Sequence, residues 1–136
     1  NDIYVIVNAV DGLDPGTYVL HRDARALEQL AGGDFREQAQ ILSCSQPTEL
    51  ARDASANIFF MCDLEATLKA FGNRGYRAAQ LEASISAGRM YLGAYAQGLG
   101  ATGLTFVDDE VTKLFSPHAV GKSAMFLLTL GKRLRK

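Results

Sequence analysis

RGYRAAQLEASISAGRMYLGAYAQ (residues 74–97), GLGATG (98–103) and LTFVDDEV (104–111) form the stretch that decides the fold of this 136-residue chain. The first segment is apolar or small nearly all round, which predicts one long helix over residues 76–97. Such a helix belongs inside a fold or between subunits, because a solvent-facing helix would carry a polar stripe. GLGATG predicts a turn in which the backbone can approach a flat ligand without intervening side chains.

Composition indicates one ordinary globular domain with 48% hydrophobic and 21% charged residues. A net charge of −1 gives no electrostatic case for binding nucleic acid or an anionic membrane surface. No apolar run reaches the roughly 18–20 residues that span a bilayer, and no signal peptide is recognisable. Cys44 and Cys62 lack metal-site spacing, so we expect no metal and a reducing, cytoplasmic setting.

Propensity and turn chemistry predict elements on both sides of the long helix. The predicted sheet contains residues 3–10, 17–20, 56–62 and 123–130, with an extended segment at 101–106. Short helices are expected at residues 24–30, 35–43, 64–70 and 108–115. Asp34 and Thr48 are candidate helix caps, and Gly72 and Gly75 are expected to bracket a loop. Strands and helices alternate after an opening hairpin, which favours an α+β or α/β layered sheet.

A family resemblance rests on the order GYR, AA, LEA, YL and GLGATG in residues 75–103, followed by DDEV at 108–111. This order resembles the C-terminal part of the FMN-dependent nitroreductase family, and most closely its SagB-type dehydrogenase subfamily. IYVIVNAVDGLDPGTYVLH (3–21) and FGNRGYR (71–77) also resemble that subfamily. The resemblance covers nearly the whole chain and implies one nitroreductase-like domain over residues 1–136. Its expected architecture is a layered α/β/α sheet packed around a long central helix.

The resemblance also implies a cofactor segment. Gly103, Leu104, Thr105 and Phe106 are expected to contact FMN, with a main-chain amide of residues 104–106 near the flavin N5. Thr105 stands where several relatives have Glu, a change that leaves a backbone contact intact. A plain helix-to-strand turn with a glycine cap is the alternative interpretation of the same residues. The family's upstream Arg-rich phosphate motif has no match here, so the sequence is expected to be a portion of a longer protein with an incomplete pocket.

Several positions depart from the subfamily's pattern. Ala70 and Phe71 stand where azoline-oxidising members carry a Lys-Tyr pair implicated in proton handling, and neither side chain can transfer a proton. Ser84-Ile85 and Gly88-Arg89 likewise stand where relatives often have Gly-His and Gln-Asn.

The basic residues near these motifs have two interpretations each. Arg74 and Arg77 match the family's RGYR, although capping carbonyls or pairing with Glu82 is the favoured role. The tail GKRLRK (131–136), with Arg133 and Arg135, could hold a phosphate but is better interpreted as a solvated tail. His21 and His118 are far apart in sequence and have no metal-ligand spacing around them.

Two functions remain open at this point. The first is an FMN-dependent oxidoreductase that transfers hydride through bound flavin, with NAD(P)H as a possible electron donor and a small molecule or peptide as substrate. The second is a catalytically degenerate nitroreductase-like domain that serves assembly or peptide binding. The chain in isolation is expected to have little or no activity.

Self-association is also expected, as a homodimer through residues 84–95 of the long helix. Ser84, Ala87 and Gly88 would leave room for another backbone. Met90, Tyr91 and Tyr95 are the large apolar anchors expected to contact the partner.

Overall fold

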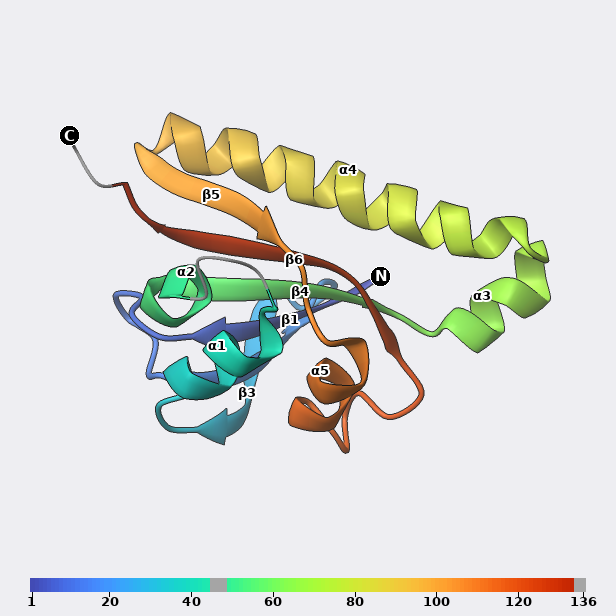
Figure 1. Ribbon diagram of the computed structural model, residues 1–136, viewed down its shortest axis with the longest axis horizontal. Helices are drawn as coiled ribbons and strands as arrows, with labels where there is room; N and C mark the ends of the chain where they lie inside the picture. Colours follow the sequence, from blue (N-terminus) through green and yellow to red (C-terminus); the bar gives the residue numbers. More distant parts are fainter. Residues whose placement is uncertain (45–48, 134–136) are drawn as a thin grey trace.

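One sheet organises the molecule, for which the computed structural model describes residues 1–44 and 49–133. Within these residues, six strands lie in the order β3-β2-β1-β4-β6-β5, and every neighbouring pair is antiparallel (Figure 1). Their bounds are β1 Asp2–Val7, β2 Gly16–His21, β3 Ala26–Gly32, β4 Ala56–Cys62, β5 Leu99–Leu104 and β6 Ser123–Lys132. The strands β3 and β5 therefore form the two edges of the sheet.

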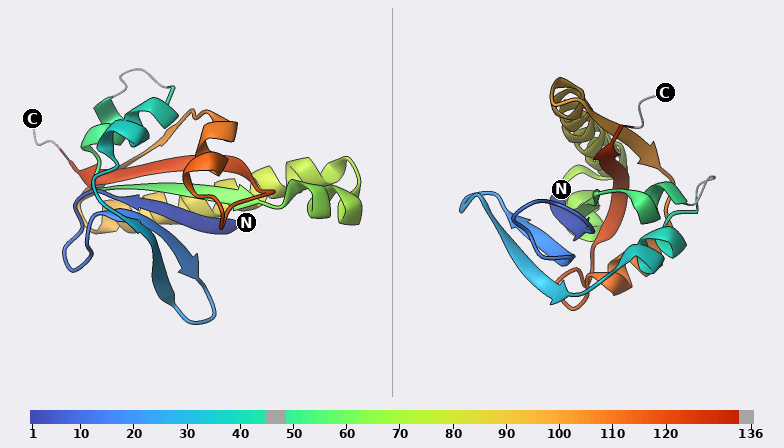
Figure 2. Two further views of the ribbon diagram at one scale, coloured as in Figure 1. Left: turned by 90° about the horizontal axis from the view of Figure 1, so that it is seen from below. Right: turned by 90° about the vertical axis from the view of Figure 1, so that its left-hand side faces the viewer.

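Helices cover both faces of this sheet (Figure 2). The longest, α4, covers one face, and α3 leads into it; the shorter α1, α2 and α5 cover the other face. Their bounds are α1 Arg36–Leu42, α2 Glu49–Asp53, α3 Leu64–Phe71, α4 Arg74–Ala96 and α5 Asp108–Leu114. The predicted layered α/β/α architecture with one long helix is confirmed.

The strand β4 shows how the two cores arise from one strand. All seven of its residues are buried. Ile58 and Phe60 point into the core beneath α4, whereas Phe59 and Met61 point into the core beneath α1, α2 and α5. This follows because successive side chains of a strand face opposite sides of the sheet. The apolar run ANIFFMC was therefore correctly predicted as an internal strand.

The helix α4 lies against the sheet through small residues. Ala79, Ala83, Ala87 and Ala94 are buried along one side of this 23-residue helix. Gly75 belongs to its first turn and not to the expected loop. A Cβ at Gly75 would lie 2.8 Å from the carbonyl oxygen of Thr67, so glycine permits the close approach of α3 and α4.

The prediction of a helix at residues 24–30 is wrong. A turn closed by the hydrogen bond from Arg25 N to the Arg22 carbonyl oxygen, 3.1 Å, reverses the chain, with Arg25 at a φ of 50°. The following residues, 26–32, pair with β2 and form β3. Ala, Leu, Glu and Gln favour helices in isolation, but pairing with β2 overrides that preference.

Other boundaries also differ from expectation. Gly98, with a φ of +73°, makes the turn after α4, and the rest of GLGATG belongs to the strand β5. The strand β1 ends at Val7 because the amides of Asn8 and Ala9 leave the ladder and bond to Ser55. Asp34 does not occupy the cap position of α1, which is Phe35, but its carboxylate accepts from Arg36 N at 3.0 Å. Thr48 lies outside the described residues.

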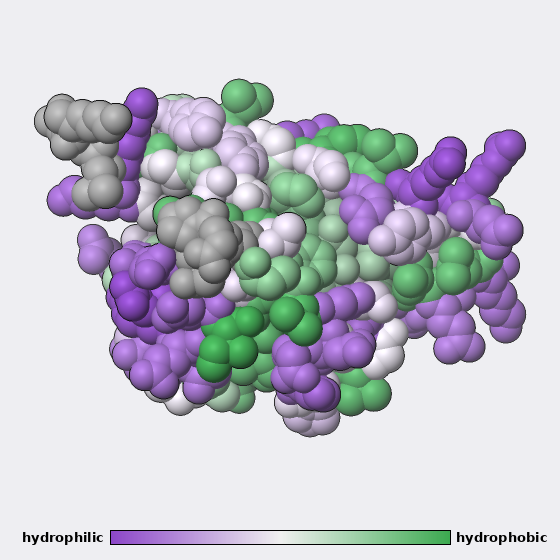
Figure 3. Space-filling model, in the orientation of Figure 1, coloured by the Kyte–Doolittle hydropathy of each residue, from purple (hydrophilic) through white to green (hydrophobic). Residues whose placement is uncertain are grey.

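None of the helices in the described part of the chain is both long and apolar enough to cross a membrane. The surface has hydrophobic side chains along α4 and over α1, beside polar ones (Figure 3). Ile41 of α1 and Leu92 of α4 are 72% and 71% exposed.

Candidate functional site

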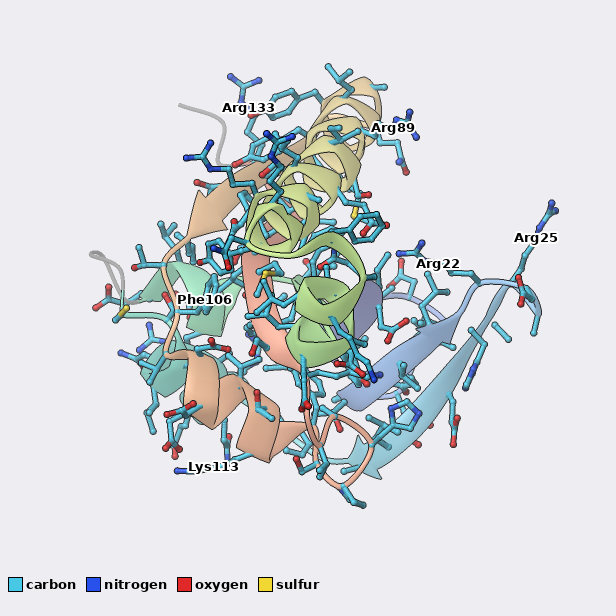
Figure 4. The ribbon with its side chains drawn as sticks, turned by 90° about the vertical axis from the view of Figure 1, so that its right-hand side faces the viewer. Arg22, Arg25, Arg89, Phe106, Lys113 and Arg133 are labelled. Atoms are coloured by element: carbon cyan, nitrogen blue, oxygen red, sulfur yellow. The ribbon has the colours of Figure 1, made fainter. Side chains whose placement is uncertain are left out.

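The proposed cofactor segment lies where the edge strand β5 leaves the sheet. Gly103 and Leu104 are the last strand residues, opposite Leu128 and Leu127 of β6. Thr105 and Phe106 follow on the connection to α5. Figure 4 shows Phe106 on that connection, beside α1 and α2. The four residues are thus contiguous at one sheet edge, as the sequence pattern requires.

Gly103 sits in a confined position. A Cβ built on it would lie 3.0 Å from Cζ of Phe126 and 3.5 Å from the Tyr91 hydroxyl oxygen. The Gly103 amide donates a hydrogen bond to that hydroxyl oxygen of Tyr91, on α4. Because this amide points away from β6, strand alternation directs the neighbouring Leu104 amide toward β6. This hydrogen bond therefore fixes the position of Gly103 relative to α4.

Contacts after Gly103 anchor the rest of the segment. Leu104 and Phe106 pack against the core beneath α1, α2 and α5. The amide of Val107 donates to the Leu42 carbonyl oxygen at 2.9 Å. The Asp108 carboxylate then accepts from the Ala124 amide at 2.7 Å, which fixes the start of α5 to β6. The backbone at residues 104–106 is consequently positioned by the sheet and by two helical elements.

The positions of the missing Lys-Tyr pair line a shallow hollow. Ala70 and Phe71, at the end of α3, lie around a volume of about 330 Å³ together with Asp2, Cys62 and Thr67. Phe71 is 67% exposed. Cys62 is buried, and its Sγ lies 3.1 Å from the Thr67 hydroxyl.

The basic residues singled out in the sequence do not converge on the cofactor segment. The side-chain amide of Asn1 donates a hydrogen bond to the Glu82 carboxylate, at 2.7 Å. The ion pairs of the described residues do not include Arg74 or Arg77. The predicted pairing of Arg74 or Arg77 with Glu82 is therefore wrong. Arg133 follows β6 beside Gly100, at the opposite end of β5 from Leu104. Arg135 lies outside the described residues.

The long helix has two faces with different roles. Ala87 is buried against the sheet, and the half-buried Met90 and Tyr91 pack on the same core, so much of the surface expected to face a partner faces the sheet instead. The opposite side carries Leu81, Ile85, Gly88, Leu92 and Tyr95, which we call the outer stripe of α4. Its four large side chains are 54–71% exposed, and spacings of four and three residues keep them in line. Ser84 is exposed, with its hydroxyl bonded to the Gln80 carbonyl oxygen.

The sequence analysis missed a cluster of ionisable side chains. The Asp2 carboxylate and the Tyr4 hydroxyl each lie 2.8 Å from the Lys122 ammonium, and the Tyr4 hydroxyl lies 2.8 Å from Nδ1 of His118. The rings of His21 and His118, which are far apart in the sequence, are 6.5 Å apart. These residues come together only because β1 pairs with β2 and β4, and β4 pairs with β6. No local motif could therefore have revealed the cluster.

The ion pair between Asp2 and Lys122 shifts the pKa of both groups. For Asp2, burial acts to raise the pKa, but the hydrogen bond and charge of Lys122 outweigh it and lower the pKa. For Lys122, burial acts to lower the pKa, but bonds to Asp2 and Tyr4 raise it. Both groups therefore stay charged near neutral pH. Among the described residues, no group of three His, Cys, Asp or Glu side chains could hold a metal ion.

Comparison with known proteins gives one family and related folds. Residues 16–131 match the model of the nitroreductase family. The chain is 22% identical over 134 residues to a candidate nitroreductase of Methanocaldococcus jannaschii. It superposes on the crystal structure of a candidate nitroreductase from Anabaena variabilis with a TM-score of 0.90 and 32% identity, over 98% of this chain. A chain of the Escherichia coli microcin synthetase McbBCD complex with truncated pro-MccB17 bound has a TM-score of 0.79 at 16% identity, which is a likeness of fold.

The chain is shorter than these relatives. It spans 65% of the length of the curated Methanocaldococcus relative. It covers 27% of the Anabaena chain and 52% of the microcin synthetase chain.

Proposed function

Because this chain belongs to the nitroreductase family, we propose that it forms part of an FMN-dependent oxidoreductase of the SagB-type dehydrogenase kind. Gly103, Leu104, Thr105 and Phe106 contact the flavin, and the bound flavin supplies hydride transfer. NAD(P)H is the proposed electron donor, and a small molecule or peptide is the substrate. The family match over most of the chain is the observation that carries this proposal.

The local structure is compatible with a flat ring at this edge. Gly103 presents no side chain, and β5 ends at Leu104, so the backbone of the next two residues is no longer part of the ladder with β6. The anchoring of Leu104, Phe106 and Val107 fixes that backbone before any ligand arrives. A donor fixed in advance costs little reorganisation when the electron distribution of a cofactor changes.

Flavin binding by the full-length protein tests this proposal. Purified protein loaded with FMN is expected to show flavin absorbance and a micromolar dissociation constant. Gly103→Ala should weaken FMN binding at least roughly tenfold, because the added methyl lies against Phe126 and displaces the segment. Gly100→Ala is the matched control in the same strand, where the nearest atom would be 3.7 Å away. Equal affinity of both variants and the parent would exclude this segment as the flavin contact.

A homodimer is part of this proposal, through the outer stripe of α4. The stripe leaves large apolar side chains in solvent on the only described helix longer than eight residues. Exposed apolar surface of this kind marks interaction sites. A second copy of the protein would cover it.

The alternative is a degenerate nitroreductase-like domain that serves assembly or peptide binding. Ala70 and Phe71, which cannot transfer protons, favour it, and the fold it shares with a subunit chain of the microcin synthetase complex is compatible with it. Stoichiometric flavin in the intact protein, bleached on addition of NAD(P)H, would exclude this alternative. Full-length protein that binds no flavin but still self-associates would support it.

A further inference from the structure

A line of four ionisable side chains ends at a hollow on the sheet face opposite α4. Asp2, Lys122, Tyr4 and His118 follow one another at 2.8 Å for each link. Tyr4 is fully buried, with its ring 5.0 Å from that of Phe115, whereas His118 is exposed. The line therefore runs from an ion pair, through a buried phenol, to an accessible imidazole.

The donor and acceptor capacities of these four groups fix where the protons lie in this line. A lysine ammonium can only donate, so the Tyr4 oxygen accepts from Lys122. The Tyr4 proton must then be donated elsewhere. His118 Nδ1 lies at 2.8 Å, whereas the carbonyl oxygen of His118 lies at 3.4 Å, so Nδ1 is the better acceptor. With Nδ1 accepting, the neutral imidazole carries its proton on Nε2.

The hollow beside His118 combines a donor with an acceptor. Its volume is about 420 Å³, and its lining includes Thr17, Glu28, Leu30, Phe115, Pro117 and His118. His21 Nε2 contacts one oxygen of the Glu28 carboxylate, at 2.6 Å. The carboxylate makes the hollow unfavourable for an anionic ligand, because like charges repel at short range. The apolar lining instead suits an uncharged ligand with an apolar side chain.

We propose that this hollow binds a neutral peptide group. The Nε2–H of His118 donates to the peptide carbonyl oxygen, and the Glu28 carboxylate accepts from the peptide N–H. Leu30 and Pro117 contact an apolar side chain beside that group. Lys122 and Tyr4 are positioning residues, because they hold His118 in the tautomer that can donate. This binding does not depend on flavin. The flavin would lie at the β5 edge of the sheet, whereas the hollow lies beside β2 and β3 at the opposite edge.

The tautomer is tested by nitrogen NMR of histidine-labelled full-length protein near neutral pH. The His118 signals, assigned by their loss in His118→Gln, are expected to show an unprotonated Nδ1 and a protonated Nε2. Tyr4→Phe and Lys122→Met should each produce a mixture of tautomers. Tyr18→Phe is the matched control, because it removes a phenol hydroxyl that donates to the Asp14 carbonyl oxygen, on a side chain buried in the core of the other sheet face. A mixture in the parent protein, or no change in both test variants, would overturn the positioning role.

Ligand class is tested with two small probes in the same samples. N-acetyl-leucine methylamide is expected to bind and to shift the His118 signals, whereas N-acetyl-leucine, its carboxylate counterpart, should bind at least roughly tenfold more weakly. Tyr4→Phe should weaken the methylamide about fivefold, the usual effect of one hydrogen bond. Glu28→Gln should allow the carboxylate probe to bind. Absence of methylamide binding, or equal binding of both probes to the parent protein, would refute the site.

Discussion

Asp2 illustrates how a single residue couples stability to pH. Its carboxylate contacts Lys122 at 2.8 Å, and its pKa is lowered from the usual 3.8, because the lysine outweighs the effect of burial. A group whose pKa is lowered in the folded state stabilises that state above its unfolded pKa. This contribution disappears as the pH falls through the folded pKa.

We therefore expect Asp2→Asn to lower the thermal midpoint near neutral pH and to make little difference well below pH ~4. The effect should be small, within the ~0–1 kcal/mol typical of partly exposed pairs, since the Asp2 side chain is 57% exposed. Thermal unfolding followed by circular dichroism between acid and neutral pH provides the measurement. Asp23→Asn, in the exposed turn before β3, changes the same charge away from Lys122 and is the control. A constant difference at all pH values would contradict this linkage.

Gly103 is the residue at which sequence and packing agree most closely. The glycine-rich pattern indicated a close backbone approach, and the structure supplies the neighbours, Phe126 and Tyr91. The side chain that accepts from Gly103 could not be predicted, however. Tyr91 was expected to face a partner, and only the direction of α4 on the sheet turns its hydroxyl toward β5.

At the scale of elements, α4 has one face packed on the sheet and an opposite face with exposed apolar side chains. The buried side uses alanines so that the helix lies close to the sheet, whereas the outer stripe exposes large side chains. The composition of the helix predicted contacts on all sides. Which residues contact the sheet and which stay exposed depends on how the helix is rotated about its axis, and a nearly uniform apolar sequence does not specify that rotation.

We expect the full-length protein to be a dimer at micromolar concentration and Ile85→Glu/Leu92→Glu to be monomeric. The two charges would be buried without partners in an interface formed by the outer stripe, at a cost well above the energy of the contacts they replace. Light scattering measures the mass directly. Ile41→Glu is the control, since Ile41 is equally exposed at 72% but lies on α1, on the other face of the sheet. A double variant that remains dimeric would exclude the stripe as the interface.

At the scale of the whole molecule, the sheet order predicts a gradient of stability. The strand β4 pairs with both β1 and β6 and is buried along its whole length, whereas β3 pairs only with β2 and is largely exposed. Amide exchange slows where opening requires the loss of buried contacts on both sides.

Hydrogen exchange measured by mass spectrometry should therefore find the slowest amides in β4 and its neighbours β1 and β6. Exchange in β3 should be at least roughly tenfold faster, because its edge opens without disturbing either core. Peptides from the two strands in one sample serve as internal controls for each other. Protection of β3 equal to that of β4 would contradict this gradient of stability.

The sequence by itself determined the buried strands β4 and β6, the long helix α4 and the family, because each rests on a local pattern of apolar residues or on a continuous motif. It predicted a helix where β3 forms, because pairing energy from a distant strand is absent from local propensity. The tertiary structure alone decided which face of α4 is exposed and that Asp2, Tyr4, His118 and Lys122 meet. Asp2 and Tyr4 are separated from His118 and Lys122 by more than one hundred positions, and only the pairing of β1 beside β4 and β4 beside β6 brings their side chains within hydrogen-bonding distance.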